Sequence, residues 1–248
     1  MSFCSASMSN PMGASDSSAR PRYYALDILR GLSILLMVLY HFAYDLELYG
    51  LIPHWLLYNP LLNFLEAFFA SVFIAISGAS STFSHNNRRR GLRILCCAMA
   101  VTLATWFFDP AFYVKFGILH FLGIAALLYD ALRPLLEKAK ISPVFWLIGF
   151  AAAKYLTAPR YEVSGLWWLG FRGASFASSD YFPLLPWFFI YLFGTWLGRF
   201  VAEGKMPPWF YSLRSRFFET IGAHTLLVYL LHQPVAMGLT LLLVRLIG

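Results

Sequence analysis

Long apolar runs separated by short polar segments dominate the sequence after residue 22. A run of roughly 17–25 apolar residues is long enough to cross a bilayer as an α-helix. The runs predict seven helices, at about 26–46, 61–84, 92–109, 114–132, 143–158, 182–202 and 219–247. The fifth run is short and the last contains Pro234, so either helix can be tilted, kinked or re-entrant. The pattern predicts an all-α, polytopic membrane bundle of about seven transmembrane helices.

The N-terminal segment has a different character. Its first twenty residues contain seven serines and no apolar core like that of a signal peptide. We therefore expect residues 1–21 to form a disordered tail and the first helix to be retained. Because no repeat and no long polar segment interrupts the rest, residues 22–248 are expected to form a single transmembrane domain.

The composition excludes an ordinary soluble fold. Hydrophobic residues make up 59% of the chain and charged residues 12%, against roughly 25% charged in average soluble proteins. The net charge of +7 does not indicate a nucleic-acid partner, because the basic residues lie between the apolar runs and not on one face with interleaved stacking aromatics. Membrane lipid is the expected surrounding.

The basic residues also give the helices a direction. Most of them fall on the side of the membrane that holds the N-terminus, whereas the opposite side holds only Lys115, Lys154, Arg160, Arg172 and Arg245. Cytoplasmic loops carry the excess of Lys and Arg in membrane proteins. The N-terminus is therefore predicted to be cytoplasmic and, with seven spans, the C-terminus external.

The first helix carries a polar stripe in the segment "RGLSILLMVLYH" and its flanks. Eleven helical steps place Arg30 and His41 within about 20° of one face and about 16 Å apart. Asp27 precedes Arg30 by three residues, and Asp45 follows His41 by four. Ionisable groups at bilayer depth are functional candidates, since they are costly unless paired or facing water. The alternative is that Arg30 and Asp27 pair at the inner boundary while His41 and Asp45 mark the outer one.

This stripe suggests a division of roles along the helix. Arg30, with Asp27 beside it, is placed to hold the phosphates of an anionic cofactor. A neutral His41 can take a proton from an acceptor near the outer end. Asp45 is expected either to orient the His41 ring or to be a solvated loop carboxylate.

Several stretches of the chain resemble a known family. The segment "LDILRGLSILLMVLYHF" is similar to the first helix of the transmembrane acyltransferases, where an Arg or Lys, ten residues and a His form the signature. Further similarity lies in "FFASVFIAISGAS", "FGILHFLGIA", "DYFPLLPWFFIYLFGTWLG" and "IGAHTLLVYLLHQPV". The sequence most resembles bacterial relatives of the heparan-alpha-glucosaminide N-acetyltransferase catalytic domain.

The resemblance implies transfer of an acetyl group from cytosolic acetyl-CoA to an amine or hydroxyl of a glycan across a bacterial inner membrane. It makes His41 the catalytic candidate and Arg30 a residue that assists donor binding. The chain lacks the long luminal part of the eukaryotic enzyme, so heparan itself is not the expected acceptor. Two routes remain as alternatives: direct transfer to the acceptor, or transfer through an acetyl-histidine intermediate. The protein is either a monomer or a homodimer.

Other polar residues of the apolar runs have two interpretations each. Glu66 either pairs with His41 in the catalytic site or bonds locally. His120 either forms a cofactor-binding wall or packs in a hydrogen-bonded core. His232 and Gln233 either line the acceptor site or repair the backbone opening at Pro234. Asp180 either binds the acceptor or caps a helix.

The remaining expectations concern the donor, metals and rival functions. Arg88, Arg89 and Arg90, in a basic inner loop, are expected to attract the phosphates of the donor. No metal is expected, because no histidines have i, i+4 spacing and no Cys/His cluster exists. The rival functions are O-acylation of an envelope polysaccharide and small-molecule transport, although transporters often contain paired inverted halves that are not visible here.

Overall fold

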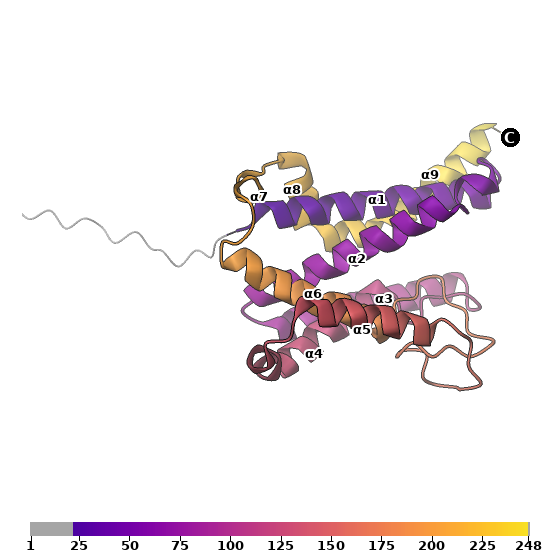
Figure 1. The fold of residues 1–248 in the computed structure, drawn as a ribbon. Coiled ribbons are helices and arrows are strands. Elements are labelled where there is room, and N and C mark those ends of the chain that lie inside the picture. Colours follow the sequence, from indigo (N-terminus) through magenta and orange to yellow (C-terminus); the bar gives the residue numbers. More distant parts are fainter. Residues whose placement is uncertain (1–21, 248) are drawn as a thin grey trace, which may run out of the picture.

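Helices form most of residues 22–247, the part of the chain that the computed structural model describes (Figure 1). In chain order they are α1 (Tyr24–Leu48), the 3₁₀ turn η1 (His54–Leu56), α2 (Pro60–Phe83), α3 (Asn87–Phe108), α4 (Ile118–Ala139), α5 (Pro143–Thr157), α6 (Leu184–Ala202), α7 (Pro208–Ser212), α8 (Arg216–Ala223) and α9 (Thr225–Ile247). In these residues the only β-type pairings are two isolated bridges, Phe116 with Tyr181 and Arg160 with Arg172. The all-α prediction is confirmed; the predicted tail of residues 1–21 lies outside the described residues.

Six of these helices are long and apolar enough to cross a membrane, namely α1, α2, α3, α4, α6 and α9. The remaining predicted span, the fifth at about 143–158, corresponds to α5, which has 15 residues and is shorter than these six. Six long apolar helices and the shorter α5 together match the expectation of about seven helices. The short length of α5 agrees with the short apolar run that predicted it. The protein is a multi-pass membrane protein.

The helix boundaries depart from the apolar runs where polar residues are helical. The third helix begins at Asn87 and not at residue 92, because the Asn86 side chain accepts a hydrogen bond from the Arg89 N–H and caps an arginine-rich first turn. The fourth helix continues to Ala139, past the predicted end at 132. The last run is divided into α8 and α9. Hydropathy marks the part of a helix that is in lipid, not the whole helix.

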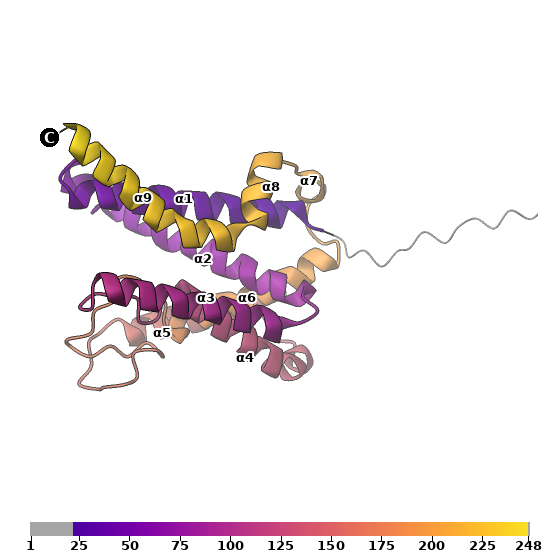
Figure 2. The same cartoon turned by 180° about the vertical axis from the view of Figure 1, so that it is seen from behind.

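The helices form two layers that are visible from both sides (Figures 1 and 2). One layer contains α1, α2, α8 and α9, and the other contains α3, α4, α5 and α6. The layers meet where α2 packs on α6: a Cβ at Gly78 would overlap the Tyr191 carbonyl, and one at Gly194 would overlap the Ala75 carbonyl. Small residues allow such close backbone approach between membrane helices.

A second close contact joins α1 to α8. A Cβ added to Gly31 would overlap the Phe218 carbonyl oxygen, and one at Gly222 would overlap that of Asp27. Because both obstacles are backbone atoms, neither position accepts a larger residue without moving a helix. The contact fixes α8 beside the start of α1.

The bundle has two ends, which we call the Arg30 end and the His41 end after the residues of α1 nearest to each. The α7 and α8 helices lie at the Arg30 end (Figure 1). The long loop of residues 158–183 lies at the His41 end, together with the C-terminus of α1 and that of α9. The two ends are therefore formed by different loops and short helices, and α1 connects them.

Candidate active site

His41 lies in the last third of α1, half-buried, with its ring held by the helix itself. Its Nδ1 is 2.9 Å from the Met37 carbonyl oxygen. Because a carbonyl oxygen only accepts, Nδ1 carries the proton and the Nε2 lone pair is left for another group. The backbone of α1 thus fixes the orientation of the His41 ring through Nδ1 and not through Nε2.

His232 of α9 faces His41. The ring centroids are 5.0 Å apart at an interplanar angle of 78°. The Nδ1 of His232 donates to the Tyr229 carbonyl in the turn before Pro234, and its buried Nε2 has no hydrogen-bond partner in residues 22–247. The carbonyl that Pro234 leaves without its helical donor is that of Leu230, so the bond from His232 to Tyr229 does not repair that opening; the ring lies beside His41.

Asp45 takes its partner from α9 and not from the neighbouring histidine. The Gln233 amide nitrogen lies 3.0 and 3.2 Å from the two carboxylate oxygens of Asp45. Asp45 is only 1% exposed. Neither expected role of Asp45 is seen in residues 22–247: no hydrogen bond joins it to His41, and it is a buried residue of α1 rather than a solvated loop carboxylate. Asp45 instead fixes α9 against α1, beside the two histidines.

Asp180 joins the site from the loop before α6. Its Oδ2 accepts the Ile118 N–H at 2.9 Å and the Tyr229 hydroxyl at 3.1 Å. Asp180 is therefore a helix cap, but of α4, 62 residues away, and not of the helix that follows it. Burial raises the pKa of the Asp180 carboxyl, and its two donors act against that rise.

Two predicted site residues have other partners. Glu66 is exposed and interacts with Tyr40, and within residues 22–247 no hydrogen bond or ion pair joins it to His41, so the expected pair is not seen. His120 accepts from the Gly117 N–H through Nδ1, at 3.3 Å, and its Nε2 lies 3.2 Å from the Thr102 hydroxyl. Both of its ring nitrogens are occupied at the start of α4, which favours the packing role over the cofactor wall.

Arg30 lies at the other end of the α1 stripe. One of its terminal nitrogens is 2.9 Å from Asp27 Oδ1 and 3.4 Å from the Gly222 carbonyl oxygen, while the other donates to the Ser80 hydroxyl. The side chain remains 19% exposed. It borders a pocket of about 270 Å³ whose lining residues are Arg22, Tyr23, Leu26, Asp27, Arg30, Ser80 and Phe83.

The arginines at the start of α3 point in different directions. Arg88 pairs with Asp130 at 2.9 Å with its side chain 77% exposed, and Arg89 is exposed. Arg90 turns inward and donates to the hydroxyls of Ser77 and Ser81, both at 2.7 Å. Helical phase separates consecutive residues by about 100°, so the three cannot share a face. The expectation grouped Arg90 with the two exposed arginines, and its inward bonds to α2 were missed.

Tyr229 was also missed. It lies three and four residues before His232 and Gln233, on the same face of α9, and its hydroxyl reaches Asp180. That spacing, three and four residues before two predicted site residues, could have indicated Tyr229.

The structure brings the predicted site residues together in two groups. It gathers His41, Asp45, His232 and Gln233 at one end, with Asp180 attached through Tyr229, and gathers Asp27 and Arg30 at the other. Residues 22–247 contain no group of three or more His, Cys, Asp or Glu side chains that could hold a metal ion.

Comparison with known proteins adds one positive finding. Residues 22–234 match the family model described as "Heparan-alpha-glucosaminide N-acetyltransferase, catalytic". The match includes both ends of the α1 stripe and reaches Pro234, just past His232 and Gln233. No curated protein and no solved structure matches the chain.

Proposed function

The chain belongs to the heparan-alpha-glucosaminide N-acetyltransferase catalytic family, and we propose that it transfers an acetyl group from cytosolic acetyl-CoA to an amine or hydroxyl of a glycan on the far side of a bacterial inner membrane. The observation that carries the proposal is the pair of facing imidazoles at the His41 end. Both rings donate through Nδ1 to a backbone carbonyl, and both leave Nε2 available.

The donor binds at the Arg30 end in this proposal. Arg30 and Arg22 line the pocket there, and a guanidinium matches phosphate oxygens with paired donors. The rings of Tyr23 and Phe83 border the same pocket, 5.0 Å apart, and offer apolar faces to a nucleotide base. Arg88 and Arg89, exposed at the start of α3, add positive charge to this end. The acyl arm of the donor then extends along α1 towards His41.

Transfer takes place at the imidazole pair. The acceptor nitrogen or oxygen attacks the thioester carbonyl, and Nε2 of His41 takes the proton that the acceptor loses. The new carbon–nitrogen or carbon–oxygen bond replaces the carbon–sulfur bond, and CoA leaves as a thiolate that takes up a proton. Nε2 of His232 faces the same space and can hold the acceptor. An acetylated His41 is the alternative first product, with the same overall balance.

Radiolabelled acetyl-CoA tests this proposal with the purified full chain and a glucosamine acceptor. A positioned general base contributes roughly 10²–10⁴-fold, so His41→Ala is expected to lower transfer by at least about 100-fold. Its matched control is His224→Ala, because His224 is exposed between α8 and α9 and bonds only locally to the Thr220 carbonyl.

Donor binding is measured in the same assay. Arg30→Lys keeps the charge but loses the paired donors, so weaker acetyl-CoA binding is expected with the folded protein retained. The proposal fails if the wild-type protein neither binds, hydrolyses nor transfers from acetyl-CoA. It also fails if His41→Ala and His224→Ala transfer equally well.

A further inference from the structure

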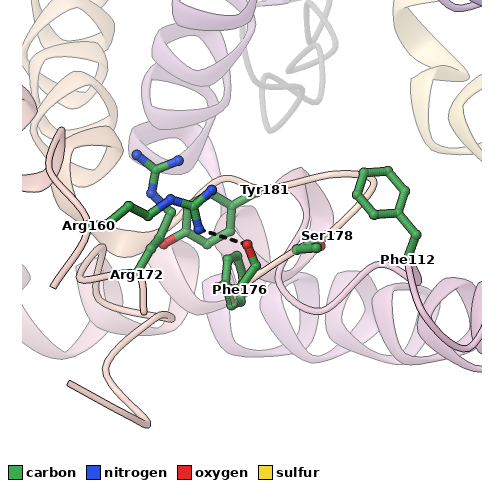
Figure 3. A pocket seen from close by; sticks show the side chains of 7 residues that line it. Phe112, Arg160, Arg172, Phe176, Ser178 and Tyr181 are labelled. Atoms are coloured by element: carbon green, nitrogen blue, oxygen red, sulfur yellow. Dashed lines mark hydrogen bonds between the residues drawn. The ribbon is translucent and has the colours of Figure 1, made fainter. Parts of the chain in front are cut away.

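A second pocket, which the proposed reaction does not use, lies at the His41 end (Figure 3). It has a volume of about 250 Å³ and is formed by the loop of residues 158–183 and the connection between α3 and α4. Its lining residues are Phe112, Arg160, Arg172, Phe176, Ala177, Ser178 and Tyr181. Drug-sized ligands occupy roughly 300–1,000 Å³, so this pocket suits a single sugar-sized ring.

The loop holds the pocket in shape through its two arginines. Arg160 Nη1 donates to the carbonyl oxygens of Gly173, at 3.0 Å, and Phe176, at 2.8 Å. Arg172 Nη2 donates to the Ala158 carbonyl at 3.1 Å. Figure 3 shows both guanidinium groups on one side of the pocket, with the bond from Arg160 to Phe176 drawn as a dashed line.

The positive charge of these arginines is not neutralised. Both donate to uncharged carbonyls, and neither forms an ion pair within residues 22–247. The Lys115 ammonium adds a third cation, 5.4 Å from the Phe176 ring centroid. The nearby Asp109 is used to cap the Ala111 and Phe112 N–H groups. An anion placed here gains charge-assisted hydrogen bonds that the protein does not supply itself.

Aromatic rings form the rest of the wall. The Phe176 and Tyr181 ring centroids are 4.8 Å apart, and Trp167 stacks on Phe176 at 5.9 Å with an interplanar angle of 20°. The Tyr181 hydroxyl is fixed by donating to the Trp167 carbonyl. Ordered aromatic faces beside guanidinium groups suit a ring with one apolar face and an anionic substituent, as in a uronate or a sugar phosphate.

The pocket is connected to the imidazole pair through its own wall. Tyr181 follows Asp180, which accepts the Tyr229 hydroxyl at 3.1 Å. The Tyr229 ring lies 5.3 Å from that of His232, which lies 5.0 Å from that of His41. A series of contacts therefore joins the wall of the pocket to the imidazole pair.

We propose that this pocket binds an anionic sugar unit of the acceptor, separate from the unit that receives the acetyl group. The identification of the ligand as part of the acceptor rests on the proposed function; the binding of an anionic sugar does not. The pocket would then select glycans that carry a carboxylate or phosphate on a unit other than the acetylated one.

Equilibrium binding to the purified full chain, without acetyl-CoA, tests the proposal. Radiolabelled glucuronate, glucose 1-phosphate and glucose are compared, with inorganic phosphate alone as a fourth probe. At least one anionic sugar is expected to bind 10-fold or more tightly than glucose and than inorganic phosphate, and the uronate and phosphate arms identify the anion. Added salt is expected to weaken the binding. Equal binding of glucose and both anionic sugars, or no binding of any, overturns the proposal.

Variants locate the site. Arg160→Gln and Arg172→Gln are each expected to weaken anionic sugar binding about 10-fold or more, the range for a lost hydrogen bond to a charged group. Arg245→Gln removes an exposed positive charge at the same end, on α9, and is expected to bind as wild type. Arg172→Lys, which keeps the charge, is expected to retain part of the affinity if the Gln variants misfold. Wild-type binding by both Gln variants contradicts the proposal.

The outcome is separable from that of the acetyl transfer. His41→Ala lacks the proposed base but retains the pocket, so it is expected to bind the anionic sugar as wild type does. Loss of transfer with intact sugar binding therefore counts against the proposed reaction alone. Intact transfer to neutral acceptors, with no preference for anionic ones, counts against this pocket alone.

Discussion

His41 and Asp45 lie one helical turn apart in α1, yet their partners come from different helices. His41 bonds to its own helix through the Met37 carbonyl, whereas Asp45 bonds to Gln233 of α9. The spacing of the sequence was enough to predict that both residues share a face with Arg30. It could not predict the partner of Asp45, because a contact across 188 residues leaves no periodic signal.

The contact between Asp45 and Gln233 makes a prediction about stability. Gln233→Leu leaves a carboxylate that is 1% exposed without its donor, and a hydrogen bond to a charged group contributes about 2 kcal/mol. We expect the variant to unfold at a lower temperature than wild type in detergent. The measurement is thermal unfolding followed by tryptophan fluorescence.

The control for this prediction is a double variant. Asp45→Asn combined with Gln233→Leu places a neutral amide where the carboxylate was, so it is expected to recover part of the lost stability. If Gln233→Leu unfolds at the wild-type temperature, or if adding Asp45→Asn lowers stability further, the carboxylate does not depend on Gln233.

At the scale of helices, the contact between α1 and α8 positions the donor pocket. Gly31 and Gly222 let the two backbones meet, and this brings the Gly222 carbonyl oxygen within 3.4 Å of Arg30. The division of the last apolar run into α8 and α9 was not predicted, because α8 carries an apolar face like the rest of the run. Only the packing of α8 against Asp27 and Gly31 of α1 shows why α8 is a separate helix.

Gly222→Ala tests this arrangement. Its Cβ would overlap the Asp27 backbone, which cannot yield without moving α8. We therefore expect acetyl-CoA binding to weaken several-fold, because Arg30 loses its position. Gly238→Ala is the matched control: a Cβ there meets nothing within 4 Å, and alanine is the better helix former. Equal donor binding by the two variants would show that the α1–α8 contact does not position Arg30.

At the scale of the whole molecule, the loop of residues 158–183 ties the two layers together at the His41 end. Asp180 bonds to α4 of one layer and to Tyr229 of the other. The apolar runs and the charge asymmetry predicted a membrane bundle and its orientation in the membrane. They did not predict the contact of Asp180 with both layers. A loop residue that caps a helix 62 residues away is determined by tertiary structure and leaves no local pattern in the sequence. For the same reason the sequence indicated only the charge of Arg160 and Arg172 and not the pocket that they line.

The layers also explain why one helix can serve both ends of the reaction. The α1 helix has Arg30 against α2 and α8 at one end and His41 against α9 at the other. Helix geometry puts these residues about 16 Å apart along the axis. A donor that enters at the Arg30 end and an acceptor at the His41 end would therefore meet inside the membrane.

Sealed vesicles test this account most directly. The full chain is reconstituted with glucosamine trapped inside and radiolabelled acetyl-CoA added only outside, and cleavage of an N-terminal tag by external protease gives the fraction of molecules whose Arg30 end faces outwards. The account predicts that labelled product accumulates inside in proportion to that fraction and is absent with His41→Ala. Product that follows the opposite orientation, or that forms only when donor and acceptor share a side, would contradict it.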